Sequence, residues 1–105
     1  FTNQGGGSCI DRNGKEVINT ITIDEAVHDN IPTFIKMDIE GAELRALAGA
    51  SETIKKHRPK LAISIYHKPE DLIEIPELIK ELRPDYRLYI RHYSTTIFET
   101  ILYAV

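Results

Sequence analysis

The segment "FIKMDIEGAEL", from Phe34 to Leu44, decides the fold class of this chain. Its apolar start has the length of a strand, and helical spacing begins after Gly41, so it predicts a buried strand that leads directly into a helix. Asp38 and Glu40 fall where the strand ends. Because ionised carboxylates are rarely buried without a partner, their position indicates either a local structural device or a binding site.

Composition limits the classes of protein to consider. The chain has 105 residues, of which 42% are hydrophobic, and this is enough for one small core but not for two domains. Its net charge of -3 comes from mixed acidic and basic residues, which argues against nucleic acid as a partner. No apolar stretch exceeds strand length, so we expect no membrane contact and a cytoplasmic location. Cys9, the single cysteine, cannot form an internal disulfide.

The first sixteen residues are rich in glycine and polar residues, so residues 1–16 are expected to be a flexible lead-in to a domain over 17–105. Within that domain, alternation and apolar runs predict strands over 16–23, 33–39, 60–66, 86–93 and 98–105. Helices are expected after Asp24, which is interpreted as an N-cap, and over 41–57 as one helix. Over 68–84 a broken or two-part helix is expected, because Pro69 and Pro76 lie inside the pattern.

Two further features of these elements shape the predicted sheet. Residues 60–66 have almost no polar interruption, which is typical of a central strand with helices on both faces. The last two strands are joined by a connection too short for a parallel crossover, so they must form an antiparallel hairpin. The broken helix is expected to bury an apolar stripe of Leu72, Ile75, Leu78, Ile79 and Leu82.

This order of elements predicts an open α/β sheet that is mostly parallel and ends in an antiparallel hairpin. Ligands of such sheets bind beyond the carboxyl ends of the parallel strands. The polar residues at the predicted strand ends should therefore converge on one edge; they are Asp38, Glu40, Tyr66, His67, Arg91, His92 and Glu99.

"IKMDIEGAELRALAGA", "RPKLAISIYH" and "ETILYAV" together resemble the C-terminal half of the FkbM family of S-adenosylmethionine-dependent methyltransferases. The hallmark of that family is Lys-x-Asp-x-Glu-Gly-x-Glu at the end of the fourth strand of a Rossmann-like sheet. Lys36, Asp38, Glu40, Gly41 and Glu43 fit it. The resemblance covers roughly residues 17–105 and implies a last strand that lies antiparallel between the fifth and sixth strands of the family sheet.

The resemblance implies transfer of a methyl group from S-adenosylmethionine to a small-molecule acceptor, with O-methylation of a sugar or another hydroxyl compound as the expected reaction. Family members carry a glycine-rich cofactor loop and a ribose-binding acid before this region, and this chain contains neither. The chain therefore resembles a fragment with at most half of a cofactor site, and whether it is active as an enzyme alone stays open.

For such a methyltransferase, Asp38 and His67 are the candidate catalytic residues. Asp38 could orient or deprotonate a hydroxyl, and His67 suits a general base; capping of the following helices is the structural alternative for both, and His67 could also simply face solvent. Glu40 and His92 are candidate substrate-binding residues. Lys36 is expected to form a structural ion pair with Asp38.

Glu43 is expected to supply only negative charge in the first turn of the helix. Two other functions stay open. The strand-end side chains could bind a divalent metal in a hydrolase, although this is not the main interpretation, in which no metal is assigned. The ligand set of the hydrolase would be Asp38, Glu40, His67 and His92.

Alternatively, the chain could be a non-catalytic module that forms a homodimer through an exposed sheet edge.

Overall fold

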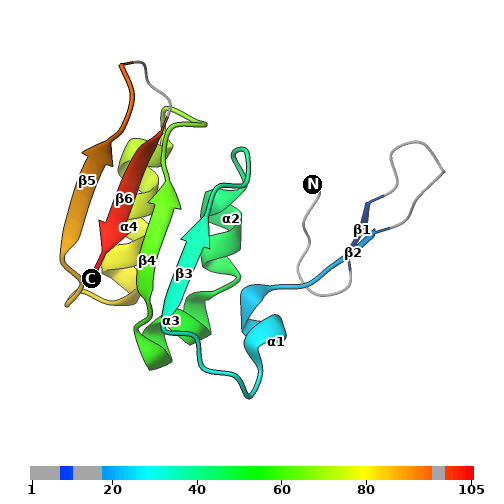
Figure 1. The fold of residues 1–105 in the computed structure, drawn as a ribbon. Helices are drawn as coiled ribbons and strands as arrows, with labels where there is room; N and C mark the ends of the chain where they lie inside the picture. The colour runs from blue at the N-terminus through cyan, green and yellow to red at the C-terminus, as the bar shows by residue number, and fades with distance from the viewer. Residues whose placement is uncertain (1–7, 11–17, 96–98) are drawn as a thin grey trace.

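The computed structural model describes residues 8–10, 18–95 and 99–105. Strands β1 (Ser8–Ile10) and β2 (Ile18–Thr20) pair with each other in an antiparallel manner and are separate from the main sheet (Figure 1). The expected lead-in over 1–16 falls mostly outside the described residues, and β1 is the part of it that can be placed.

The main sheet has the strand order β3-β4-β6-β5. Its strands are β3 (Phe34–Met37), β4 (Lys60–Ser64), β5 (Leu88–His92) and β6 (Thr100–Ala104). β3 and β4 pair in parallel, whereas β6 runs antiparallel to both β4 and β5. The expectation of a mostly parallel sheet is therefore wrong, because β6 returns between β4 and β5 and separates them. The terminal antiparallel hairpin is confirmed, as is the place that the resemblance implied for the last strand.

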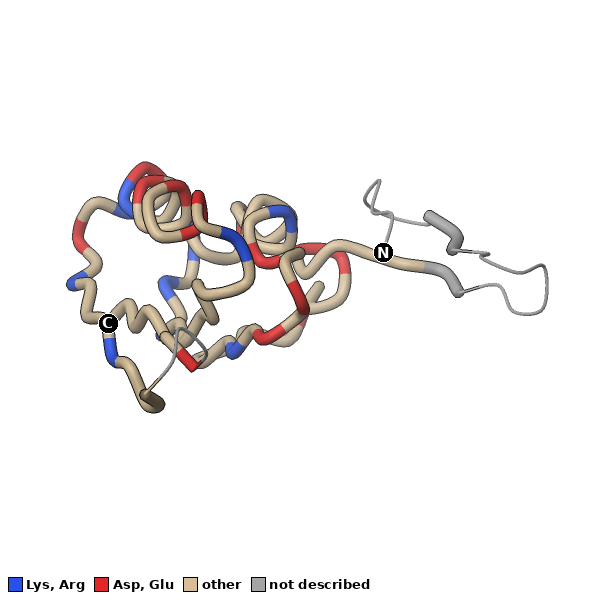
Figure 2. The backbone as a smooth tube through the Cα atoms, turned by 90° about the horizontal axis from the view of Figure 1, so that it is seen from above, with Lys and Arg blue, Asp and Glu red and all other residues tan. Residues whose placement is uncertain are grey.

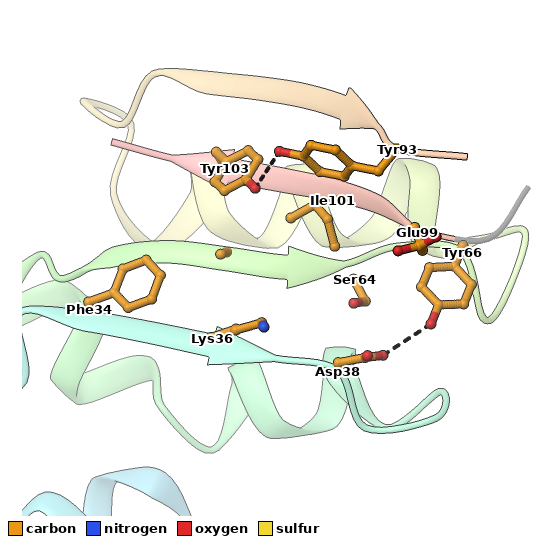
Figure 3. Close-up of a pocket in the computed structure, with 10 residues that line it drawn as sticks. Phe34, Lys36, Asp38, Ser64, Tyr66, Tyr93, Glu99, Ile101 and Tyr103 are labelled. Carbon is orange, nitrogen blue, oxygen red and sulfur yellow. Dashed lines mark hydrogen bonds between the residues drawn. The ribbon is translucent and has the colours of Figure 1, made fainter. Parts of the chain in front are cut away.

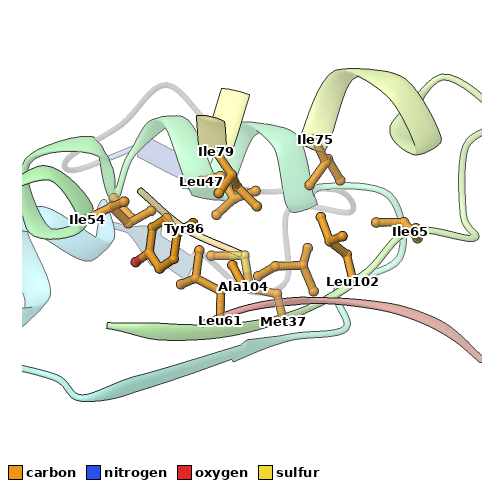
Figure 4. Close-up of a cluster of buried hydrophobic side chains, with 12 residues drawn as sticks. Met37, Leu47, Ile54, Leu61, Ile65, Ile75, Ile79, Tyr86, Leu102 and Ala104 are labelled. Atoms are coloured by element: carbon orange, nitrogen blue, oxygen red, sulfur yellow. The ribbon is translucent and has the colours of Figure 1, made fainter. Parts of the chain in front are cut away.

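The helices α2 (Glu43–Ala48), α3 (Ser51–His57) and α4 (Asp71–Leu82) lie on one face of this sheet (Figure 1). Side chains alternate along a strand, so Leu61 and Ile63 of β4 point toward the helices while Ala62 and Ser64 point to the opposite face. The core between sheet and helices is shown in Figure 4; its buried members are Met37, Leu47, Ala50, Ile54, Leu61, Ile63, Ile65, Ile75, Ile79, Tyr86, Leu102 and Ala104.

The opposite face of the sheet carries no helix in the described part of the chain. The expectation that helices cover both faces of the strand at 60–66 is therefore not met there. Ala62 and Ser64 are nevertheless only 5% and 1% exposed, although no helix of the described residues lies above them. Both side chains are small, so β4 is a buried strand even on this face. This uncovered face becomes important for the candidate site.

Helix α1 (Ile23–Val27) begins two residues earlier than expected. Thr22 is its N-cap and forms a capping box with Glu25, in which the Thr22 side chain accepts from the Glu25 N–H and the Glu25 carboxylate accepts from the Thr22 N–H. The assignment of Asp24 as the N-cap of this helix is therefore wrong.

Asp24 instead stabilises the start of α3. Its N–H donates to the carbonyl of Gly49 at 2.9 Å, and its carboxylate accepts from the N–H and the hydroxyl of Thr53 at 2.8 and 2.7 Å. These bonds hold the chain at the break between α2 and α3, where a single helix was expected. A side chain from outside the helix thus provides the cap that allows a second helix to begin.

Helix α4 is continuous, although Pro76 lies inside it and a break was expected. Proline removes the helical donor to the carbonyl four residues earlier, here Leu72. Leu72 is 51% exposed, while Ile75 and Ile79 are fully buried and hold the helix on the sheet. The assignment of Leu72 to the buried stripe is wrong.

In the described residues, every helix is too short or too polar to cross a bilayer.

Arg58 ties together the end of the sheet opposite to the strand-end residues. It ends α3 in the left-handed conformation, at φ 49°. Its guanidinium lies 2.8 Å from Asp85 Oδ2, donates to the carbonyl of Val105, and sits 5.0 Å from the centre of the Tyr86 ring. Arg83 also binds both carboxylate oxygens of Asp85.

Figure 2 shows acidic and basic residues interspersed along the described backbone.

Candidate active site

The connection between β3 and α2 is shaped by a buried carboxylate. Glu40 and Gly41 both have left-handed backbone conformations, with φ of 58° and 99°. Glu43, the first residue of α2, is fully buried, and its two oxygens accept from the N–H groups of Ile39 at 2.7 Å and Gly41 at 3.0 Å. Glu43 is therefore more than the first-turn charge that was expected. Its place in the Lys-x-Asp-x-Glu-Gly-x-Glu pattern was the available signal.

His67 follows the end of β4 and lies against three carboxylates. Its side chain is 11% exposed. The Nδ1 atom is 3.1 Å from Glu43 Oε2, and the Nε2 atom is 3.5 Å from Asp38 Oδ1 and 3.6 Å from Glu40 Oε2. The strand ends thus bring together Asp38, Glu40 and His67, which were predicted to converge, and Glu43 completes the group.

Tyr66 connects this cluster to the uncovered sheet face. Its ring centre is 4.1 Å from that of His67, and its hydroxyl donates to Asp38 Oδ1 at 3.3 Å (Figure 3). Burial raises the pKa of the Tyr66 hydroxyl above its ordinary value, and the negative charge of Asp38 raises the pKa further. Tyr66 therefore stays a neutral hydrogen-bond donor beside the Asp38 carboxylate.

A hollow of about 420 Å³ lies over the uncovered face of the sheet. Ala62 and Ser64 of β4 line it. Lys36 and Asp38 lie on the β3 side (Figure 3). Within the described residues Lys36 has no ion-pair partner, so the structure does not show the expected pair with Asp38. Aromatic and aliphatic side chains complete the lining together with one acid; they are Phe34, Tyr66, Tyr93, Ile101, Tyr103 and Glu99.

His92 lies apart from this group. Its Nδ1 atom is 2.7 Å from the Thr100 hydroxyl, across the β5–β6 ladder. The two residues line a different hollow together with Ile65 and Leu72. The structure therefore brings together three of the four predicted site residues and places the fourth elsewhere.

Asp71 is a second buried carboxylate near Glu43. It is 1% exposed, and its Oδ2 atom has no hydrogen-bond partner among the described residues. Burial raises the pKa of Asp71 above its ordinary value, and the charge of Glu43 raises the pKa further. A second negative charge behind Glu43 is therefore disfavoured.

The cluster also has the chemistry of a metal ligand set. Asp38, Glu43 and His67 each offer one ligand atom, and these atoms lie within 4.8 Å of one another. Carboxylate oxygens and imidazole nitrogen are usual ligands of divalent transition metals. However, both oxygens of Glu43 already accept backbone hydrogen bonds.

Comparison with known proteins gives the family. The family model of the methyltransferase FkbM domain matches residues 3–90. The chain belongs to the FkbM methyltransferase family. A crystal structure of a methyltransferase FkbM from Methylobacillus flagellatus KT is similar to it, with 44% sequence identity and a TM-score of 0.81. The match covers 96% of this chain and 26% of that FkbM protein, so the chain spans about a quarter of its relative's length. A search of curated proteins found no match.

Membership of the FkbM family suggests use of S-adenosylmethionine, and the described residues fit part of that cofactor. Asp38 and Glu40 place negative charge at the carboxyl edge of the sheet, which suits a positively charged sulfonium. Within the described residues, no glycine-rich loop joins a strand to a helix to hold the rest of the cofactor. The glycines at 5–7 lie outside the described residues.

Proposed function

We propose that this chain forms the acceptor side of an S-adenosylmethionine-dependent methyltransferase site. The expected reaction is O-methylation of a sugar or another small hydroxyl compound. The observation that carries the proposal is the convergence of Asp38, Glu40 and His67 at the carboxyl edge of β3 and β4, beside a hollow of about 420 Å³. Ligands of open α/β sheets bind at this edge.

In this proposal each side chain handles the acceptor hydroxyl. The cofactor, when bound, supplies a methyl group on a positively charged sulfur, and the acceptor oxygen must approach it in line. Asp38 accepts a hydrogen bond from the hydroxyl and orients it. His67 Nε2, which is 3.5 Å from Asp38 Oδ1, takes the proton as the oxygen forms its new bond. Glu40 holds a neighbouring polar group of the acceptor.

Two variants test these roles in a methyl-transfer assay. Asp38→Asn keeps the size of the side chain but loses its charge, and we expect a large fall in kcat. His67→Gln removes the base, so we expect loss of the acid limb of the pH–rate profile together with activity, since general bases contribute about 10²–10⁴-fold. Glu77→Gln, an exposed change on α4, is the matched control. Full activity in Asp38→Asn, or an unchanged pH profile in His67→Gln, would contradict the assigned role.

Cofactor binding is tested by calorimetric titration of the chain with S-adenosylmethionine and S-adenosylhomocysteine. Micromolar binding of either would support a cofactor site that includes these 105 residues. A folded chain that releases no heat with either ligand would contradict it.

A metal-dependent hydrolase is the second candidate function, and the group Asp38, Glu43 and His67 is the observation that favours it. The metal would activate a water molecule at the same sheet edge. This group differs from the set first considered, because it holds Glu43 in place of Glu40 and because His92 lies elsewhere. A parallel titration with Zn²⁺ and Mn²⁺ separates the candidates: tight metal binding without cofactor binding favours the hydrolase.

We also propose that a homodimer can form through a sheet edge, in a cytoplasmic protein. β3 and β5 are the edges of the described four-stranded sheet, and Phe34 and Ile90 on them are 54% and 51% exposed. Unpaired strand edges offer backbone groups to a second copy. Sedimentation at increasing concentration tests the dimer, and a monomer throughout would contradict it; cell fractionation tests the location.

A further inference from the structure

The strands of the main sheet carry charge of one sign on the uncovered face. The four described strands contain no aspartate or glutamate, and their lysine and arginine residues are Lys36, Lys60 and Arg91. Lys36 lines the hollow together with Ala62, and Lys60 lies two positions before Ala62 on β4. Arg91 pairs with Ile101, which also lines the hollow. Alternation therefore places all three cations on the uncovered face, in a chain whose net charge is -3.

The acids that line the hollow lie together at one end of it. Asp38 follows β3, and Glu99 precedes β6 beside the end of β4 (Figure 3). Lys36 lies two residues before Asp38 and pairs with Ala62, farther from this end. Among the described residues Lys36 has no ion-pair partner. The hollow therefore has an acidic end at the carboxyl edge and a free positive charge farther along β3.

Aromatic rings lie on both sides of this positive charge. Phe34 on β3 is 54% exposed, and Tyr93, which follows β5, is 57% exposed; both line the hollow (Figure 3). Tyr103 joins them from β6, and its hydroxyl is 2.7 Å from that of Tyr93, which holds these two rings together. Exposed aromatic rings beside a small side chain such as Ala62 suit a ligand that contains a ring.

We propose that the acceptor of this site is anionic: a ring compound whose hydroxyl lies at the acidic end of the hollow and whose carboxylate or phosphate binds Lys36. The inference rests on the proposed function, in which Asp38 accepts from the reacting hydroxyl. Two positions along a strand span about 7 Å, so the anionic group lies about that far from the hydroxyl. Lys60 and Arg91, on the same face, add positive charge that attracts an anion.

A neutral ring of the same shape fits this arrangement less well. To lie along β3 between Phe34 and Asp38, a ligand must cover the Lys36 ammonium, and covering a charge without giving it a partner is costly. A carboxylate or phosphate replaces the lost water with a charge-assisted hydrogen bond. The volume of about 420 Å³ is that of a site for one small molecule. Lys36 therefore selects the acceptor by its charge.

Titration with three sugars tests the preference for charge. D-glucuronate, D-glucose 6-phosphate and D-glucose share their ring hydroxyls and differ at carbon 6, which carries a carboxylate, a phosphate or a neutral hydroxyl. Each is added to the ¹⁵N-labelled chain at low salt, where charge interactions are least screened, and the amide signals are followed by NMR.

We expect at least one charged sugar to shift the amide signals of Lys36, Ala62 and Tyr103 and to bind about tenfold more tightly than glucose. The tighter of the two charged sugars shows whether the site prefers a carboxylate or a phosphate. Equal binding of all three sugars would overturn the inference. So would the absence of shifts at these residues with both charged sugars.

Lys36→Met tests whether Lys36 is the cause of the preference. Methionine has a similar unbranched side chain without the charge, so the charged sugar should lose about tenfold in affinity and bind like glucose. Lys36→Arg keeps the charge and should keep the preference. Lys56→Met, at an exposed position on α3, is the matched control and should leave all three affinities unchanged. A Lys36→Met chain that still prefers the charged sugar would overturn the inference.

These titrations contain no cofactor, so they can fail separately from the proposed function. A charge preference in a protein that transfers no methyl group would refute the methyltransferase proposal and leave the anion site in place. In an active methyltransferase, Lys36→Met should raise KM for an anionic acceptor more than it lowers kcat. An unchanged KM would overturn the inference and leave the methyltransferase proposal in place.

Discussion

Removing the Glu43 carboxylate should destabilise the fold measurably. In Glu43→Ala, the N–H of Gly41 loses its acceptor in a buried setting and the N–H of Ile39 loses its acceptor in a part-buried one. Each buried donor left without a partner costs about 1–3 kcal/mol, so two cost about 2–6 kcal/mol. Burying a carboxylate is itself unfavourable, and its removal offsets part of this loss. We therefore expect the free energy of unfolding to fall by about 3 kcal/mol.

Urea unfolding followed by circular dichroism measures this change. With a slope near 1.5 kcal/mol per molar urea, a loss of about 3 kcal/mol lowers the midpoint by about 2 M. The control Glu77→Ala changes an exposed glutamate on α4 and should shift stability by less than about 0.5 kcal/mol. If the midpoint of Glu43→Ala moved no further than that of Glu77→Ala, the two backbone bonds to Glu43 would not be structural, and the argument for the connection after β3 would fail.

Three further predictions concern the core, the acid side of the pH range and the cluster. Ile75→Ala should cost about 2–5 kcal/mol in urea unfolding because Ile75 is fully buried, whereas Ile73→Ala, at a 65% exposed position, should cost less than about 0.5. The pKa of Asp85 is held below its ordinary value of 3.8, chiefly by the hydrogen bond from the Arg83 side chain. The folded state therefore favours the carboxylate, and the stability from Asp85 is full above about pH 4 and is lost as the pH falls. Asp85→Asn should flatten the acid limb of a pH series of unfolding midpoints, and an unchanged limb would contradict this. Absorbance titration should show Tyr66 ionising above the ordinary pH for tyrosine, and Asp38→Asn should lower that pH; no change would refute the contact.

Local patterns in the sequence were sufficient for much of the fold. The four strands of the main sheet and its helices were predicted near their positions, because strand alternation and helical spacing are short-range signals. The break between α2 and α3 was missed because its bonds come from Asp24, which lies 29 residues before Thr53 in the chain. Leu72 follows the helical period but lies outside the buried stripe, since burial depends on what the helix packs against.

The candidate site was predicted in part for a related reason. Strand ends gave Asp38, Glu40 and His67, since the carboxyl edge of a parallel pair can be read from the order of elements. His92 was included because β5 also ends at that edge, but its side chain alternates to the helix side and bonds Thr100. The role of Glu43 could not be read from helical spacing, because its burial depends on the left-handed turn at Glu40 and Gly41.

Strand β4 divides its residues between two tasks that can change separately. Leu61 and Ile63 contribute to the core beneath the helices, while Ala62 and Ser64, one position along, line the hollow. A larger residue at 62 or 64 would make the hollow shallower and leave the helix contacts of its neighbours in place. Related proteins could therefore bind acceptor molecules of different size by exchanging alternate residues of one strand. Such an exchange alters no loop and leaves the packing that keeps the sheet folded nearly unchanged.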